Sequence, residues 1–108
     1  MKIYRVENKE GSGPFAAGSY FLNAAKKHKA PFEWPNFKEA CKFLDSPTSK
    51  FGFDNENALY EVFGDDFAFL AENEFYLSVY EAEPLVSGPD GQVIFDIKEA
   101  TLAERTKI

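Results

Sequence analysis

Cysteine and histidine are scarce in this 108-residue chain, which has one of each, Cys41 and His28. One cysteine cannot form an internal disulfide, and one Cys with one His cannot make a zinc site unaided. We therefore expect no metal and no cofactor. A Cys41–His28 nucleophilic pair is disfavoured, because Cys41 is expected on the inward face of a helix as a buried, inert thiol. His28 stands among lysines, where a solvated helix end is expected.

Long hydrophobic runs and phosphate-binding motifs are also missing. No stretch approaches the roughly 18 apolar residues that a membrane span needs, and no signal-peptide pattern opens the chain. The glycine-rich link at 8–14 has neither the P-loop spacing nor the dinucleotide fingerprint, and is expected to be a turn. The sequence thus predicts a soluble, cytoplasmic protein with no membrane association.

Basic residues are absent between Lys50 and Lys98. Residues 1–50 hold nine Lys and Arg against five Asp and Glu, whereas residues 51–108 hold three against thirteen. Such a surface repels phosphates and attracts cationic partners, so direct binding to nucleic acid is not expected. A negative face that only provides solubility is the simpler interpretation.

Aromatic side chains are abundant, at 17% of the chain with 12 Phe. The segment Phe75–Glu81 is aromatic or aliphatic at five of its seven positions, with apolar side chains on both faces, which is typical of a strand with neighbours on both sides. Further strands are predicted at 2–7, 51–53 and 92–96, with a final edge strand favoured over a helix at the C-terminus. Residues 75–83 and 92–96 are expected to pair in an antiparallel manner.

Four helices are predicted between the first strand and the later ones. They cover 19–29 with Ser19 as N-cap, about 37–45 with Asn36 as N-cap, 55–63 with Asp54 as N-cap, and 67–72. Gly64 is expected to stop the third helix. Trp34, in a proline-bounded linker, is expected to cover the edge of the core rather than to serve as a partner anchor. The predicted fold is α+β: one compact domain, 1–108, with a small, mostly antiparallel sheet.

Short motifs spread over most of the chain resemble a group of small uncharacterised bacteriophage and prophage proteins. The matching pieces are Ile3-Tyr4-Arg5-Val6-Glu7, Gly11 with Gly13-Pro14-Phe15, Phe51-Gly52-Phe53, Val79-Tyr80-Glu81 and Gln92-Val93-Ile94-Phe95. Phe51 stands where relatives often have Cys, and Val62-Phe63 stands where they have Trp-Phe. The resemblance implies a phage context, and hence the cytoplasm of the host cell, but carries no activity with it.

A phage context favours a protein that binds a host protein and inhibits or modulates it. The hypothesis is that carboxylates meet the Arg and Lys of a basic, nucleic-acid-binding surface, such as that of a defence nuclease, by mimicking phosphates. An enzyme is the less favoured class. The predicted partner-binding residues are Asp54, Glu56, Glu61, Asp65, Asp66, Glu72 and Glu74.

An alternative hypothesis comes from the enzyme class. The chain also resembles a reduced ADP-ribosyltransferase, in which an aromatic-Arg pair on an early strand, here Tyr4-Arg5, grips a dinucleotide phosphate. The resemblance implies a nucleotide site of Tyr4 and Arg5, with Glu81 or Glu83 as the acidic residue. The simpler interpretation is that Arg5 pairs with a carboxylate of the sheet.

Overall fold

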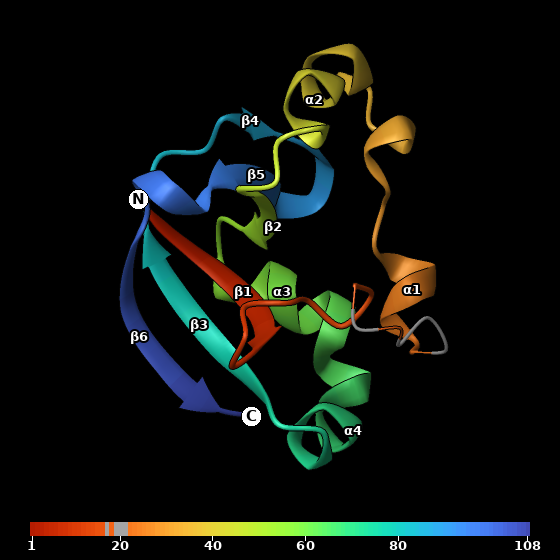
Figure 1. Ribbon diagram of the computed structural model, residues 1–108. Helices are drawn as coiled ribbons and strands as arrows, with labels where there is room; N and C mark the ends of the chain where they lie inside the picture. The colour runs from red at the N-terminus through yellow and green to blue at the C-terminus, as the bar shows by residue number, and fades with distance from the viewer. Residues whose placement is uncertain (17, 19–21) are drawn as a thin grey trace.

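The computed structural model describes residues 1–16, 18 and 22–108, and within them an α+β fold in which helices cover a six-stranded antiparallel sheet (Figure 1). The strands are β1 (Lys2–Asn8), β2 (Ser49–Phe53), β3 (Phe75–Glu81), β4 (Val86–Ser87), β5 (Gln92–Asp96) and β6 (Thr101–Lys107). The α-helices are α1 (Ala24–Lys27), α2 (Phe37–Leu44), α3 (Glu56–Phe63) and α4 (Phe67–Glu72). Short 3-10 turns occupy Pro31–Glu33, Gly64–Asp66, Pro89–Gly91 and Ile97–Glu99.

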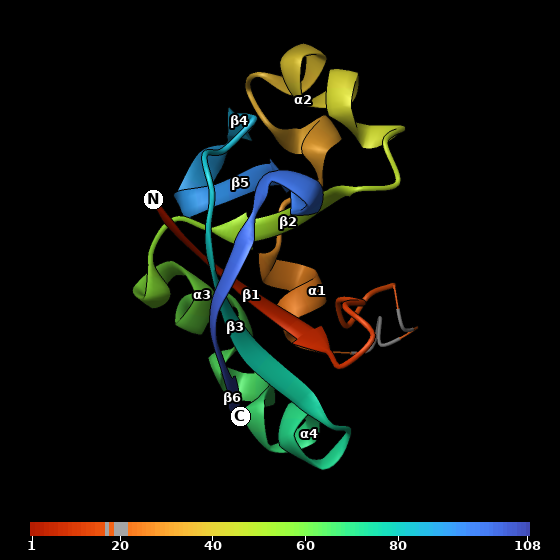
Figure 2. The same ribbon diagram turned by 60° about the vertical axis from the view of Figure 1, so that its left-hand side comes forward.

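The sheet order is β4-β5-β2-β1-β3-β6. The predicted α+β class, the insertion of the helices after β1 and the C-terminal edge strand are all confirmed. The predicted pairing of 75–83 with 92–96 is wrong, because β1 and β6 occupy the two edges of β3 while β5 pairs with β2 and β4. Figure 2 shows β6 running beside β3, with β2 and β5 in the other half of the sheet.

The two halves of the sheet meet where β2 crosses β1, at the single aligned pair Tyr4–Phe53. Gly52 permits this crossing, since a Cβ atom there would lie 2.5 Å from Cγ2 of Ile3. Beyond the crossing the two strands separate, and a hydrogen bond of 2.7 Å from Nη1 of Arg5 to the carbonyl of Phe51 spans the gap. This fork between β1 and β2 leaves space that loops and helix side chains line.

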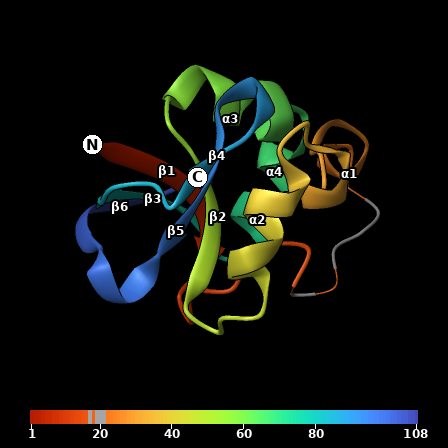
Figure 3. The same cartoon turned by 90° about the horizontal axis from the view of Figure 1, so that it is seen from above.

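The main hydrophobic core lies between the sheet and the helices α1, α3 and α4. It contains Leu59, Val62 and Phe63 of α3, together with Leu70 of α4 and Phe75 of β3. Seen from above, α1, α2 and α4 lie on one side of the molecule and β1, β3 and β6 on the other (Figure 3). The helical layer therefore presents its outer face to solvent.

Trp34 is the centre of a smaller cluster under α2 and is only 1% exposed, which confirms its predicted place in the core. The prediction that Cys41 lies on the inward face of α2 is wrong. Ala40 and Phe43 face the cluster, whereas Phe37, Cys41 and Leu44 are exposed, because the packed stripe is rotated by about one position around the helix. Cys41 is thus an exposed thiol rather than a buried one.

Two of the predicted caps also differ. Asn36 precedes α2, but its side chain donates to the carbonyl of Ser87 instead of capping the helix. Asn55, not Asp54, caps α3 by accepting from the amide of Ala58 at 2.8 Å. The predicted stop at Gly64 is confirmed, since α3 ends at Phe63 with Gly64 as its C-cap, and a 3-10 turn then leads into α4. Ser19 and the predicted start of the first helix lie outside the described residues.

Candidate functional site

Six of the seven predicted partner-binding carboxylates are exposed on one helical segment of the chain. This segment, residues 54–74, contains α3, the 3-10 turn and α4, and has no Lys or Arg. Its exposed acids are Asp54, Glu56, Glu61, Asp65, Glu72 and Glu74. We call these six residues the acidic set.

Asp66, the seventh predicted residue, has a different role. It is only 5% exposed, and its carboxylate accepts hydrogen bonds from the amides of Asn23 and Ala24 and from the side chain of Asn23. The first turn of α1 leaves backbone N–H groups without helical partners, and the carboxylate of Asp66 satisfies them across the fold. Asp66 is therefore a structural residue whose carboxylate is bound within the fold, and it does not belong to the acidic set.

Charge neutralisation within the acidic set is limited. Asp65 pairs with Nζ of Lys27 at 2.8 Å, and this hydrogen bond and charge lower the pKa of the Asp65 carboxyl. Glu56 accepts from the hydroxyl of Tyr60. Among the described residues, ion pairs reach no other member of the set, so Glu61, Glu72 and Glu74 keep their charge for solvent or a partner.

The residues of the alternative nucleotide site are not brought together. Arg5 is 8% exposed, and its guanidinium donates to the carboxylate of Glu7 and to two backbone carbonyls. Tyr4 precedes Arg5 in the strand and faces the opposite side of the sheet. Glu81 lies at the end of β3, where it pairs with the N-terminal amine at 3.7 Å.

Arg5 belongs to a buried charged network that the sequence did not predict in full. Glu7, 1% exposed, bonds to Arg5, Arg105 and the hydroxyl of Tyr80. Burial alone would raise the pKa of Glu7, but hydrogen bonds from Tyr80 and Ser78 and the two arginines outweigh it, so the pKa lies below 4.5. Burial and the bond to Glu7 raise the pKa of Tyr80 to about 12. This network joins β1, β3 and β6.

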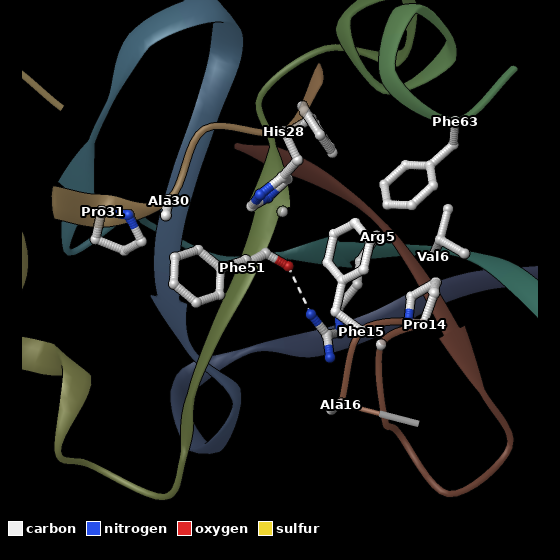
Figure 4. A pocket seen from close by; sticks show the side chains of 13 residues that line it. Arg5, Val6, Pro14, Phe15, Ala16, His28, Ala30, Pro31, Phe51 and Phe63 are labelled. Carbon is white, nitrogen blue, oxygen red and sulfur yellow. Dashed lines mark hydrogen bonds between the residues drawn. The ribbon is translucent and has the colours of Figure 1, made fainter. Parts of the chain in front are cut away.

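A cavity of about 340 Å³ occupies the fork between β1 and β2 (Figure 4). Its walls come from β1, from the loop at 13–16, from the segment 28–31 after α1, from β2 and from α3. The rings of Phe15, Phe51, Phe53 and Phe63 line it, and Arg5 lies at its wall. The lining is predominantly apolar and aromatic, which is typical of a ligand-binding pocket.

His28 is the one imidazole of the chain and lines this cavity. Its ring meets those of Phe15, Phe51 and Phe53 edge-on, with centroid distances of 5.5, 6.0 and 6.3 Å. The expectation of a solvated His28 is therefore wrong, because the chain turns back toward the sheet after Lys27 and carries the ring into the fork. Burial lowers the pKa of His28, partly offset by the charge of Glu33.

Acidification should destabilise the protein through His28. Its folded-state pKa lies below the ordinary 6.5, so as the pH falls past 6.5 the unfolded chain takes up the proton first and unfolding becomes easier. We expect the free energy of unfolding to fall between pH 7 and pH 5.5, and the variant His28→Phe to lose most of that dependence. Urea unfolding at several pH values measures both, and an unchanged slope in the variant would contradict this assignment.

Among the described residues, no cluster of His, Cys, Asp or Glu could hold a metal ion. None of the helices in residues 1–16, 18 and 22–108 has the length and apolar character needed to cross a bilayer. The family model of the bacteriophage T4 Y00F protein matches residues 1–108.

The chain belongs to the bacteriophage T4 Y00F protein family. Membership of the Y00F family confirms the resemblance to small phage proteins. Curated proteins and solved structures give no match to the chain. The structure of this Y00F protein offers two candidate sites, the acidic set and the cavity around His28.

The cavity is the feature of this Y00F protein that reasoning from the sequence missed. Its residues come from five separate segments, and no spacing links His28 to the phenylalanines. A local signal was present in two short motifs, the turn Gly13-Pro14-Phe15 and the end of β2, Phe51-Gly52-Phe53, which both place phenylalanine rings at the cavity.

Proposed function

We propose that this phage protein binds a host protein through the acidic set and so inhibits or modulates it in the host cytoplasm. The partner is a protein with a basic, nucleic-acid-binding groove. The observation that carries the proposal is the exposure of six carboxylates on the 21 residues 54–74, a segment with no basic residue. Exposed carboxylates on a helical segment can occupy arginine and lysine side chains that otherwise neutralise phosphates.

An aromatic side chain near these acids, Tyr60, favours a protein interface over a negative surface that only provides solubility. Tyr60 of α3 is 40% exposed and borders a groove of about 360 Å³ that Glu56 and Glu104 also line. Tyrosines that are partly exposed at the rim of a groove are frequent anchors in protein interfaces. The proposed interface therefore combines the acidic set with Tyr60.

Affinity capture from host lysate tests the proposal. The tagged protein is incubated with lysate treated with nuclease, washed, and eluted with rising salt. We expect one dominant partner that binds nucleic acid and is released by salt, since screening weakens exposed charge pairs. Capture of a partner without affinity for nucleic acid would contradict this form of the proposal.

Charge reversal of Glu61 and Glu72 together to Lys should weaken binding to that partner by roughly tenfold or more, mainly through slower association. Both side chains are exposed and without ion pairs among the described residues, so the fold should be retained. The matched control is Glu10→Lys with Glu99→Lys, which changes the net charge equally at exposed positions outside the segment. Equal losses in the two variants, measured by surface plasmon resonance, would show that only net charge matters.

A further inference from the structure

The cavity in the fork between β1 and β2 is large enough for a small ring system. An apolar cavity of about 150 Å³ already accepts benzene, so the volume of about 340 Å³ corresponds to one or two fused aromatic rings. The walls are made by the edges and faces of Phe15, Phe51 and Phe53, which favour a ring packed against them in offset or edge-on geometry. The cavity is therefore matched to a planar aromatic ligand.

The cavity also offers a polar group that the protein does not use. The ring nitrogens of His28 form no hydrogen bond with other described residues, and Figure 4 shows the imidazole standing among the rings of the cavity. A neutral imidazole has one nitrogen that donates and one that accepts. By contrast, Arg5 at the wall is already bound to Glu7, Phe51 and Gly11.

A charged ligand does not suit this site. Moving a carboxylate or phosphate from water to apolar walls is costly unless a counter-charge is available, and the nearest cation, Arg5, is paired with Glu7. A hydroxyl does suit it, because it can donate to one imidazole nitrogen or accept from the other. The hydroxyl therefore matches His28 whichever nitrogen carries the proton.

From these contacts we infer that the cavity binds an aromatic molecule of one or two rings that carries a hydroxyl group, with the hydroxyl bonded to His28. The same chemistry can come from a free phenolic compound or from the side chain of a tyrosine on another protein. This inference does not use the acidic set, so its test is independent of the proposed binding of a host protein.

The test compares three ligands of similar shape by isothermal titration calorimetry at pH 7.5. The first is 2-naphthol, the second 2-methoxynaphthalene, which only accepts a hydrogen bond, and the third 2-methylnaphthalene, which does neither. We expect all three to bind, with 2-naphthol tighter than 2-methylnaphthalene by roughly 3- to 10-fold, as for one hydrogen bond. Equal affinities, or no binding of any of the three, would overturn the inference.

Two variants locate the site. His28→Phe keeps an aromatic ring in the wall but removes both nitrogens, so the preference for 2-naphthol should disappear while 2-methylnaphthalene still binds. Ala30→Leu adds volume to the wall from the same segment, 28–31, without changing His28, and should weaken all three ligands together. A preference for 2-naphthol that survives in His28→Phe would also overturn the inference, with circular dichroism confirming that each variant is folded.

The source of the ligand is distinguished with p-cresol and N-acetyl-tyrosinamide. Tighter binding of N-acetyl-tyrosinamide indicates a tyrosine side chain of a protein, since the mouth of the cavity then accommodates a backbone. Tighter binding of p-cresol indicates a free phenolic compound. Failure of both to bind to a cavity that accepts 2-naphthol would limit the ligand to two fused rings and contradict the single-ring part of the inference.

Discussion

Replacing Glu7 by Gln should lower the free energy of unfolding by about 3 kcal/mol or more. The carboxylate is 1% exposed and accepts from Arg5, Arg105 and Tyr80. Removing one member of a buried ion pair leaves the remaining charge uncompensated, which typically costs about 3 to 5 kcal/mol. A glutamine has the same shape, but its amide group presents N–H donors where a carboxylate oxygen accepted. Urea unfolding at pH 7 measures the loss.

The pH dependence provides the internal check on this prediction. Because the folded-state pKa of Glu7 is below 4.5, its stabilising contribution is complete above that pH and is lost as the pH falls through the folded-state pKa. The difference between the wild-type protein and Glu7→Gln should therefore shrink on acidification. The control is Glu104→Gln on β6, an exposed carboxylate whose loss should cost less than about 0.5 kcal/mol. Similar losses in both variants at pH 7 would contradict the buried network.

Replacing Trp34 by Ala should cost about 3 to 5 kcal/mol, as for other fully buried large aromatic residues. The ring packs with Ala40, Val86 and Ile94, and its Nε1 donates to the carbonyl of Lys29 at 3.1 Å. The surrounding chain has little freedom to fill the space left by the ring. Far-UV circular dichroism with urea is the appropriate measurement, because the variant lacks the only tryptophan of the chain.

The matched control for Trp34 lies two residues before it. Phe32 is 74% exposed in the same proline-bounded segment, so Phe32→Ala should change the free energy of unfolding by less than about 0.5 kcal/mol. A second test comes from Gly88, where a Cβ atom would lie 2.5 Å from the Trp34 ring. If Gly88→Ala proved harmless, the tight packing of this cluster would be refuted.

The strands were predictable because their signal is local. The run of aromatic and aliphatic residues in Phe75–Glu81 identifies a strand without reference to the rest of the chain. The C-terminal segment has no such run, and there the strand was only favoured over a helix. The partners of β3 were not predictable, because β1 comes from the other end of the sequence. Pairing between strands far apart in the sequence depends on how all the elements pack. The apolar pattern of a strand predicts that it has neighbours but not which strands they are.

The site residues show the same limit. Exposure of Glu61 and Glu72 follows from their place opposite the apolar stripe of each helix, which local periodicity predicts. Asp66 is adjacent to an exposed acid and has the same composition around it, yet it caps the distant helix α1. His28 is surrounded by lysines in the sequence, yet its ring lies in the fork between β1 and β2. Contacts between distant segments determine where the side chains of Asp66 and His28 lie.

Competition with nucleic acid tests the central proposal most directly. The captured host protein is purified, and its affinity for this phage protein is measured with and without a saturating amount of its own nucleic-acid ligand. The account predicts mutually exclusive binding, with the apparent affinity falling in proportion to the nucleic acid added and falling again with salt. A ternary complex with unchanged affinity would contradict the occupation of a nucleic-acid groove by the acidic set.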